Sequence, residues 1–429
     1  MLKEIRIKNF KSLRDTGVLE IKPITILVGP NSSGKSSLIQ FLLMIKQTAE
    51  SRDYRNPLIF DGTCIKLESY RNIIWKNNTN LNLEFEFSFE EGILEQFPTF
   101  ANVKYHVVFY GKKGRVSGIH SFKFVDRKEG KVILTIRWGK EIEKPIIEEC
   151  SFSDDIKKAL SEHLTFLKFH PFFVLPIPDF EKDEKPIANA ITSMYFFDNY
   201  FSRGICYLGP LREFPQRYYS ISGTTLEDIG FKGERAVEVL IGRKDIVNGV
   251  RKWVKKFDLA QDVTVKSLRE RTLAEIILKD PSLLFNVNLY DVGFGVSQIL
   301  PIIVEGFYAP DGSILLIEQP EIHLHPKLQA DMGDLLIEIT KAKKKLIVET
   351  HSEHLLLRIQ RRIAEGILNV EDVAIYYFNL TTEGTQITKM KIDETGRIEN
   401  WPEGFFEEDI KESIAITKAI MDREKEKIL

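Results

Sequence analysis

The sequence predicts an α/β fold in which a mostly parallel sheet carries a phosphate-binding loop, with an antiparallel β-lobe and a helical insertion. Three observations lead to this expectation. Residues 24–28 have the pattern of a buried strand and lead into residues 29–36, a full match to GxxxxGKS that is followed by an amphipathic helix. From residue 314 onward, apolar strands alternate with helical patterns. Residues 81–138 contain segments that alternate polar with apolar residues, as an antiparallel sheet with one solvated face does.

The phosphate-binding loop supplies the first candidate binding residues. Its glycines let the backbone curl so that N–H groups point at phosphate oxygens, and the start of the following helix adds its positive dipole end. Lys35 would reach the β- and γ-phosphates, and Ser36 would place its hydroxyl on Mg²⁺. We therefore expect a nucleoside triphosphate to bind here. The expected contacts are Asn31, Ser32, Ser33, Gly34, Lys35, Ser36 and Ser37.

Length and composition are those of an ordinary soluble protein. The chain has 429 residues, 43% of them hydrophobic, and a net charge of −2, so no global basic field favours nucleic acid. Its three cysteines, Cys64, Cys150 and Cys206, are scattered and predict reduced thiols. No run approaches the length of a membrane span. We expect a cytoplasmic protein with no membrane partner.

The pattern along the chain predicts four regions. They are a P-loop ATPase core (residues 1–50 and 285–380), an antiparallel β-lobe (51–150), a mostly helical insertion (151–284) and a C-terminal extension (381–429). Residues 1–10 alternate charged with apolar residues, which predicts an exposed edge strand. No heptad repeat runs through residues 40–290, so no long coiled coil is expected.

A second chemical signal follows the apolar residues 314–317. They end in Glu318, which predicts a buried strand that delivers a carboxylate to the carboxyl edge of the sheet, where the phosphate-binding loop also lies. There Glu318 could join Ser36 in holding Mg²⁺. The alternative is a surface glutamate at the end of a strand.

A third signal follows the apolar residues 346–348. Thr350 and Glu353 have the spacing of a capping box, which predicts a helix start directly after this strand. His351 would then lie at the same sheet edge, close to a γ-phosphate. The alternative is a purely structural histidine.

Two further segments are less specific. Residues 291–298 place Gly293 and Gly295 before Ser297, which we expect to cap an apolar helix where backbone can approach an anion; a plain glycine loop fits equally well. Residues 341–345 are rich in lysine, and we expect a solvated loop between helix and strand rather than a DNA-binding patch.

Taken together, these segments resemble the heads of ABC-type ATPases, in which a phosphate loop, a glycine–serine signature, a strand–Glu–x–Pro segment and a strand–Thr–His–Ser segment occur in this order. Residues 7–12 (IKNFKS) look like the start of the RecF/SMC/OLD branch. Residues 207–213, 318–326 and 401–406 (WPEGFF) are similar to bacterial AAA-family ATPases with a C-terminal domain of unknown function. The resemblance covers about residues 1–50 and 205–408.

The resemblance implies ATP and Mg²⁺ as cofactors and a homodimer that depends on nucleotide. Two heads would sandwich two nucleotides, and Ser297 of one subunit would reach the γ-phosphate held by the other. Lys11 and Ser12 look like the N-terminal pair that touches the nucleotide, and His351 resembles the switch histidine. Arg212 is a candidate sensor of phosphate charge or of the partner, with a structural salt bridge as the alternative.

One departure concerns catalysis. Most such heads carry a second acid after the first, whereas this chain has Gln319. Gln can orient a water but cannot take its proton. Either Glu321 serves as base or hydrolysis is slow, and we expect slow hydrolysis with Glu318, Gln319 and Glu321 sharing the site.

The resemblance also implies a biological setting of DNA repair or of defence against phage and plasmids. The chain would act on DNA or on a separate nuclease or toxin effector. The alternative is a nucleotide-gated scaffold that binds or inhibits a toxin or nuclease with little hydrolysis.

Overall fold

The computed structural model describes most of the chain. The described residues are 1–51, 56–90, 103–112, 115–137, 146–151, 154, 157, 158, 200–223, 226, 228–268, 272–280, 285–402 and 415–417. Nearly all of the expected helical segment at residues 151–199, and residues 403–414 of the C-terminal extension, lie outside this description.

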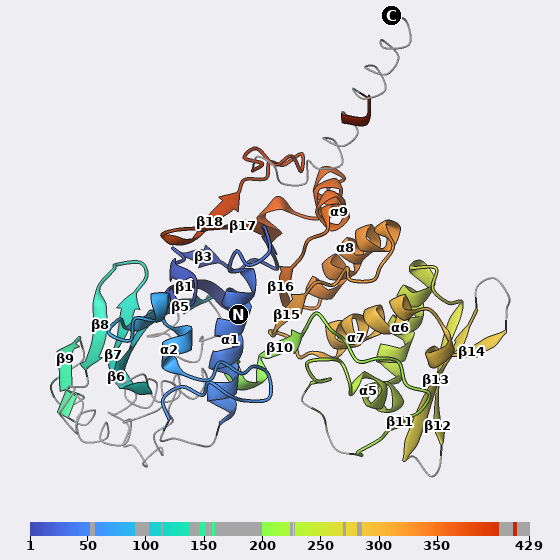
Figure 1. Ribbon diagram of the computed structural model, residues 1–429, viewed down its shortest axis with the longest axis horizontal. Helices are drawn as coiled ribbons and strands as arrows, with labels where there is room; N and C mark the ends of the chain where they lie inside the picture. The colour runs from blue at the N-terminus through green and yellow to red at the C-terminus, as the bar shows by residue number, and fades with distance from the viewer. Residues whose placement is uncertain are drawn as a thin grey trace, which may run out of the picture.

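A six-stranded sheet forms the centre of the molecule (Figure 1), in the order β10-β15-β16-β4-β17-β18. Its strands are parallel except for β18, which is antiparallel to β17. Because β4 lies between β16 and β17, the residues that follow β4 and β16 meet at one edge. The expected mostly parallel sheet is therefore confirmed. The strands are β4 (Ile24–Val28), β10 (Ile205–Leu208), β15 (Ile314–Glu318), β16 (Lys345–Glu349), β17 (Val373–Thr381) and β18 (Gly384–Met390).

Both faces of this sheet are buried, because alternate residues of its strands enter two different cores. On one face Leu27 and Leu316 pack in the same core as helix α1 and the antiparallel sheet. On the other face Ile26 and Ile317 pack in the core of helices α7, α8 and α9. Burial on both sides explains the continuous apolar runs of the sequence. The helices are α1 (Lys35–Glu50), α7 (Phe294–Tyr308), α8 (Pro326–Thr340) and α9 (Glu353–Ala364).

A second, antiparallel sheet of eight strands lies beside α1 (Figure 1), as the alternating segments predicted. Its order is β2-β1-β5-β6-β7-β8-β9, and β3 also pairs with β1. The strands are β1 (Leu2–Phe10), β2 (Leu13–Asp15), β3 (Leu19–Glu20), β5 (Leu83–Phe89), β6 (Val103–Lys112), β7 (Arg115–Asp126), β8 (Val132–Arg137) and β9 (Ile146–Cys150).

The expected edge strand at the N-terminus was wrong. Strand β1 pairs with β5 on one side and with β2 and β3 on the other, so it lies inside the antiparallel sheet. Its charged residues face the solvated side and find partners across the strands: Lys8 lies 3.4 Å from Glu84, and Arg6 lies 3.9 Å from Glu86. One solvated face gives the same alternation to an inner strand as to an edge strand.

The insertion is less helical than the sequence suggested. After α5 and α6, residues 262–279 form the paired strands β12 and β13, with β11 and β14 completing a small antiparallel sheet. In β13 the residues Ala274, Ile276 and Leu278 are buried and those between them are not, which is the two-residue period of a strand. The elements are α5 (Ala236–Gly242), α6 (Lys244–Lys256), β11 (Tyr219–Ser220), β12 (Asp262–Leu268), β13 (Leu273–Lys279) and β14 (Asn286–Asn288).

Four short elements complete the described part of the chain. They are helix α2 (Tyr70–Ile73) and the 3-10 turns η1 (Trp75–Asn77), η6 (Leu289–Asp291) and η7 (Val370–Asp372). The longest helix in the described ranges is α1, with 16 residues, so those ranges contain no long coiled coil. None of the described helices has the length and apolar character needed to cross a membrane.

The lysine-rich residues 341–345 form a solvated loop only in part, because residues 341–343 are exposed but the last two lysines are buried. Lys344 and Lys345 are 3% and 1% exposed. The Lys345 ammonium donates to the backbone carbonyls of Leu2 and Ile21 at 2.8 and 2.6 Å and pairs with Glu90 at 2.7 Å. Their alkyl stems and satisfied ammonium groups let both lysines join a core, and Lys345 ties the N-terminal strand to the parallel sheet.

Candidate nucleotide-binding site

The phosphate-binding loop leaves the carboxyl end of β4 and enters α1. Gly29 and Gly34 have φ values of 137° and 104°, in the region that favours glycine. A Cβ on Gly29 would lie 2.2 Å from the carbonyl oxygen of Phe378 in β17, so the close approach of these two strands also requires glycine. Asn31 and Ser32 are exposed at the top of the loop, while the Ser33 hydroxyl is buried with no hydrogen-bond partner among the described residues.

Lys35 folds back over this loop. Its ammonium donates to the carbonyls of Gly29 and Pro30 at 2.9 and 2.8 Å, and its side chain is 3% exposed. Burial lowers the pKa of Lys35. The charge is therefore already held above the curled backbone, where the motif requires it.

Ser36 contacts an acid that the sequence analysis did not single out. Its hydroxyl donates to the carboxylate of Glu349, with oxygen distances of 2.9 and 3.1 Å. The same carboxylate lies 3.9 Å from the ammonium of Lys35 and is 4% exposed. The missed signal is the one that pointed to Glu318, because Glu349 also ends a run of apolar strand residues.

Glu318 lies beside Glu349 on the neighbouring parallel strand, where the two residues are register partners. The Tyr207 hydroxyl, on the next strand β10, donates to the Glu318 carboxylate at 2.8 Å. Burial, and next the charge of Glu349, raise the pKa of Glu318 to about 7. Burial also raises the pKa of Glu349. The ends of β15 and β16 thus carry neighbouring acids, and the acid of β16 contacts Lys35 and Ser36.

Arg212 holds the turn that follows Glu318. Its guanidinium donates to the carbonyls of Glu318 and Gln319 at 2.8 and 2.9 Å, and the residue is 3% exposed. Gln319 is half-buried and adopts a φ of 45°, a conformation that is uncommon for a residue other than glycine. The structure therefore gives Arg212 backbone partners in this turn, where we had considered a phosphate sensor or a salt bridge.

Glu321 faces the switch-like segment after β16. Its carboxylate accepts a hydrogen bond from the backbone N–H of His351 at 2.6 Å, and burial raises its pKa. Burial lowers the pKa of His351, and the charge of Lys35 lowers it further, so the imidazole lies within electrostatic reach of the loop lysine. The expected capping box was wrong, because Ser352 rather than Thr350 caps α9 and accepts from the backbone N–H of Leu355.

The N-terminal pair lies against the phosphate-binding loop. The Lys11 ammonium donates to Gln40 of α1 at 2.5 Å. The Thr385 hydroxyl of β18 donates to the Ser12 hydroxyl at 2.9 Å, and a Cβ on Gly34 would lie only 2.5 and 2.7 Å from the hydroxyls of Thr385 and Ser12. Thr385 and Gln40 therefore belong to the surroundings of the site, although no sequence motif includes either of them.

Ser297 is not the N-cap residue that the sequence predicted. The helix α7 begins at Phe294 with Gly293 as its cap, so Ser297 lies within the helix rather than at its cap. The residue is 5% exposed. The N-cap lies four residues earlier than expected, because the buried apolar face of the helix already begins at Val296 and continues at Ile299.

The oxygen ligands at this edge fit a magnesium ion better than a softer metal. The Ser36 hydroxyl and the carboxylates of Glu318 and Glu349 offer hard oxygen donors, the kind that Mg²⁺ prefers. Within the described ranges no cluster of three or more His, Cys, Asp or Glu side chains could hold a metal by itself.

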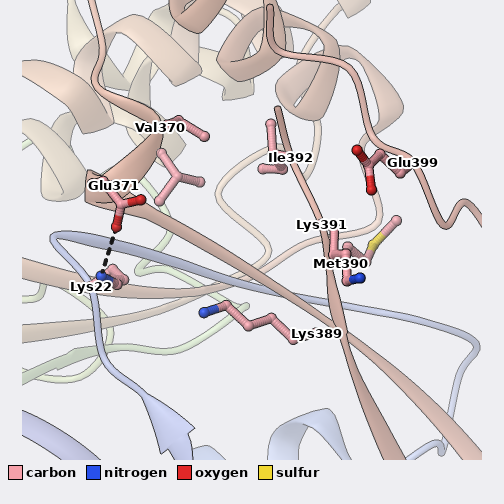
Figure 2. A pocket seen from close by; sticks show the side chains of 9 residues that line it. Lys22, Val370, Glu371, Lys389, Met390, Lys391, Ile392 and Glu399 are labelled. Carbon is pink, nitrogen blue, oxygen red and sulfur yellow. Dashed lines mark hydrogen bonds and ion pairs between the residues drawn. The ribbon is translucent and has the colours of Figure 1, made fainter. Parts of the chain in front are cut away.

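A cavity of about 480 Å³ lies at the opposite edge of the parallel sheet (Figure 2). Lys22 before β4, Val373 at the start of β17 and Met390 at the end of β18 line it. Lys22 is paired with Glu371 across the rim at 3.5 Å. The phosphate-binding loop follows the other end of β4, so this cavity is separate from the candidate nucleotide site.

Comparison with known families agrees with this geometry. Residues 24–358 match the family described as "AAA domain, putative AbiEii toxin, Type IV TA system". The chain belongs to this AAA-domain family. Residues 368–413 match the family described as "Protein of unknown function (DUF3696)", so the resemblance drawn from the sequence is confirmed at both ends. No curated protein matched the chain in sequence.

Solved SMC heads are similar to the chain at low sequence identity. An SMC head bound to the C-winged helix domain of ScpA is 12% identical, with a TM-score of 0.48 over 92% of this chain and 98% of that one. The SMC head domain from Thermotoga maritima is 13% identical, with a TM-score of 0.41 over 91% and 99%. The head derived from Pyrococcus furiosus, with an extended coiled coil and bound to the C-terminal domain of ScpA, is 12% identical, with a TM-score of 0.46 over 98% and 99%.

Proposed function

We propose that this protein binds ATP with Mg²⁺ and hydrolyses it slowly, as a head that dimerises around nucleotide. The observation that carries the proposal is the meeting of Lys35, Ser36, Glu349 and Glu318 at one edge of the parallel sheet. A cationic amine, a curled backbone and acids that can hold a cation are the parts that phosphate binding requires.

Each part has a distinct task. The backbone N–H groups of residues 31–37 cradle the phosphates, with Lys35 countering their charge. Ser36 and Glu318 hold the Mg²⁺, which when bound neutralises charge on the phosphate oxygens. Lys11 and Ser12 lie against the loop and contact the nucleotide from the N-terminal side.

Slow hydrolysis follows from the acids around the reacting phosphate. Gln319 can orient a water but cannot accept its proton. Glu321 could accept one, yet one oxygen of its carboxylate is bonded to the His351 N–H and the other is buried, with no hydrogen-bond partner among the described residues. We propose that Glu318, Gln319, Glu321 and His351 share the site and that no single group acts as an efficient base.

Dimerisation would place the Ser297 segment of one subunit on the phosphate held by its partner. Because Ser297 is 5% exposed, its surroundings have to rearrange for this contact. Nucleotide binding can select such a rearranged state if it binds that state more tightly.

The chain would act on DNA or on a separate nuclease or toxin effector in the cytoplasm, in DNA repair or in defence against phage and plasmids. The family description, which includes a putative AbiEii toxin and a type IV TA system, supports the defence setting. Gln319 favours a second candidate function, a nucleotide-gated scaffold that binds or inhibits a toxin or nuclease with little hydrolysis.

Calorimetric titration with ATP and Mg²⁺ tests nucleotide binding. We expect the parent to bind and Lys35→Ala to lose at least roughly tenfold in affinity, since the loop then lacks its cation. Lys255→Ala, at an exposed position of α6, is the matched control and should bind like the parent. A parent that retains no ATP would refute the proposal.

Light scattering with ATP and Mg²⁺ tests the dimer, for the parent, Lys35→Ala and Glu321→Gln. We expect Lys35→Ala to remain a monomer and Glu321→Gln to accumulate as a dimer. A monomer for every variant would exclude the sandwich. Steady-state turnover with and without duplex DNA then separates the two candidates, because undetectable hydrolysis in both conditions favours the scaffold.

A further inference from the structure

The nucleotide site holds one more acid than the motifs require. Glu318 ends β15, as expected of the acid beside a bound cation, but Glu349 ends β16, which lies between β15 and the strand of the phosphate loop. Of these two acids, Glu349 therefore lies on the strand next to that of the phosphate loop, and its carboxylate accepts a hydrogen bond from the Ser36 hydroxyl.

Glu349 forms a loose ion pair with Lys35 rather than a close one. Its carboxylate is 4% exposed and lies 3.9 Å from the ammonium of Lys35. Among the described residues, that ammonium donates its hydrogen bonds to the carbonyls of Gly29 and Pro30 rather than to Glu349. Buried carboxylates are costly unless a cation compensates them. A divalent cation beside Ser36, Glu318 and Glu349 would supply such compensation.

Resting on the proposed function, we infer that Glu349 is a second acidic ligand for the cation that accompanies ATP, and that it makes ATP binding depend on that cation. Without a divalent cation, the negative charge of Glu349 repels phosphates drawn to Lys35. With the cation present, the same charge contributes to holding it. Metal-free ATP is therefore discriminated against by one residue of this chain.

A purely structural role gives a different expectation. If Glu349 only anchors the Ser36 hydroxyl, the amide oxygen of Gln can accept the same hydrogen bond, and Glu349→Gln should leave ATP binding unchanged in both conditions. If Glu349 acts through its charge, the substitution strengthens ATP binding in the absence of Mg²⁺ and reduces the gain in affinity that Mg²⁺ brings.

The experiment measures the affinity of a fluorescent ATP analogue in excess EDTA and in excess Mg²⁺ for the parent and for Glu349→Gln. We expect Glu349→Gln to bind the analogue roughly tenfold more tightly in EDTA and to gain at least roughly tenfold less from Mg²⁺ than the parent does, a change of about 1.4 kcal/mol. Glu305→Gln, which removes another buried carboxylate far along α7, is the matched control and should keep the parent's gain from Mg²⁺.

Each outcome decides the inference. A variant whose gain from Mg²⁺ equals that of the parent overturns the role of Glu349 while the proposed function stands. A parent that binds no analogue even with Mg²⁺ overturns the proposed function together with this inference. Unfolding curves without nucleotide establish that Glu349→Gln is folded, and Glu349→Asp, which keeps the charge on a shorter side chain, should retain most of the dependence on Mg²⁺.

Discussion

The hydroxyl of Thr385 lies 2.8 Å from the backbone carbonyl of Ser33, so a strand near the end of the chain braces the phosphate-binding loop near its beginning. The backbone N–H of Thr385 also donates to the Ser12 carbonyl at 2.8 Å. Residue 385 belongs to the C-terminal family match at residues 368–413 rather than to the AAA-domain match. The C-terminal family region therefore contributes a contact to the candidate nucleotide site.

Thr385→Val should weaken nucleotide binding. The substitution keeps the side-chain shape but leaves the buried carbonyl of Ser33 without its donor, which costs about 1–2 kcal/mol of unfolding free energy. Because the loop is then less well held, we expect ATP affinity to fall roughly three- to tenfold. Urea unfolding and titration with a fluorescent ATP analogue measure the two effects.

Thr388→Val is the control for this prediction, because Thr388 lies on the same strand with its side chain exposed. It should change neither quantity. Unaltered ATP affinity in Thr385→Val would mean that the loop holds its shape without this brace.

Gln319→Glu should raise the rate of ATP hydrolysis. The two side chains have nearly the same shape, so the backbone of Gln319 need not change: it keeps its φ of 45°, and its N–H still donates to the backbone carbonyl of Glu349 at 2.7 Å. A carboxylate at this position can take a proton from water, and general bases contribute roughly a hundredfold or more. We expect at least a roughly tenfold rise in phosphate release at saturating ATP and Mg²⁺.

Gln386→Glu, at an exposed position of β18, should leave phosphate release unchanged. If Gln319→Glu binds ATP but hydrolyses it no faster than the parent, the geometry of the site rather than the missing base limits the reaction, and the scaffold gains support.

The central sheet could be predicted because its strands are buried on both faces and therefore appear as continuous apolar runs. Those runs also indicated where Glu318 and His351 would lie, since a residue after a parallel strand falls at the carboxyl edge. The pattern does not say which acid meets Ser36, because that depends on strand order. Only the placement of β16 next to β4 gives the contact to Glu349.

Contacts between segments far apart in the chain could not be predicted from the sequence for the same reason. Thr385 is an ordinary threonine in a polar strand, and nothing local marks its contact with Ser33. The inner position of β1 could not be predicted, because in a sheet with one solvated face the inner strands and the edge strands show the same alternation of polar and apolar residues. Strands β12 and β13 were missed because the short alternation at residues 262–279 follows a long helical pattern.

Arg212→Lys tests whether Arg212 positions the turn after Glu318. The planar guanidinium donates to two carbonyls at once, those of Glu318 and Gln319, and the single ammonium of Lys cannot reproduce both bonds. We expect a loss of about 1–3 kcal/mol in unfolding free energy and a fall in ATP turnover with nearly unchanged ATP affinity. Lost affinity with unchanged stability would instead indicate a phosphate sensor. Arg243→Lys, at an exposed position, is the control.

Stability should depend on pH through Glu305, which lies on α7 and is 1% exposed. Burial raises its pKa from 4.5 to about 7; the charge of Asp228 acts in the same direction, while the Cys206 thiol and the Lys344 ammonium oppose it. The backbone N–H of Ile229 donates to one carboxylate oxygen at 3.3 Å, and the other has no partner among the described residues.

A carboxyl group whose pKa is higher in the folded than in the unfolded chain stabilises the fold below its unfolded pKa and loses that contribution as the pH rises through its folded pKa. For Glu305 the loss falls between about pH 4.5 and 7. Glu305→Gln cannot ionise, so its unfolding free energy relative to the parent should rise by on the order of 2 kcal/mol between pH 5 and 8. Urea unfolding at several pH values measures the difference.

Glu338→Gln gives the comparison with the opposite sign. A hydrogen bond from Lys252 lowers the pKa of Glu338 from its ordinary value of 4.5. The stabilising contribution of Glu338 is therefore lost only as the pH falls from that value through the lower pKa of the folded chain. The difference between Glu338→Gln and the parent should therefore stay flat from pH 6 to 8, while that of Glu305→Gln still rises. Parallel pH profiles for the two variants would contradict the prediction, because Glu305 would then be ionised throughout this range. A buried, ionised carboxylate would need a cation beside it, whereas the Lys344 ammonium donates to the carbonyls of Gly306 and Phe307.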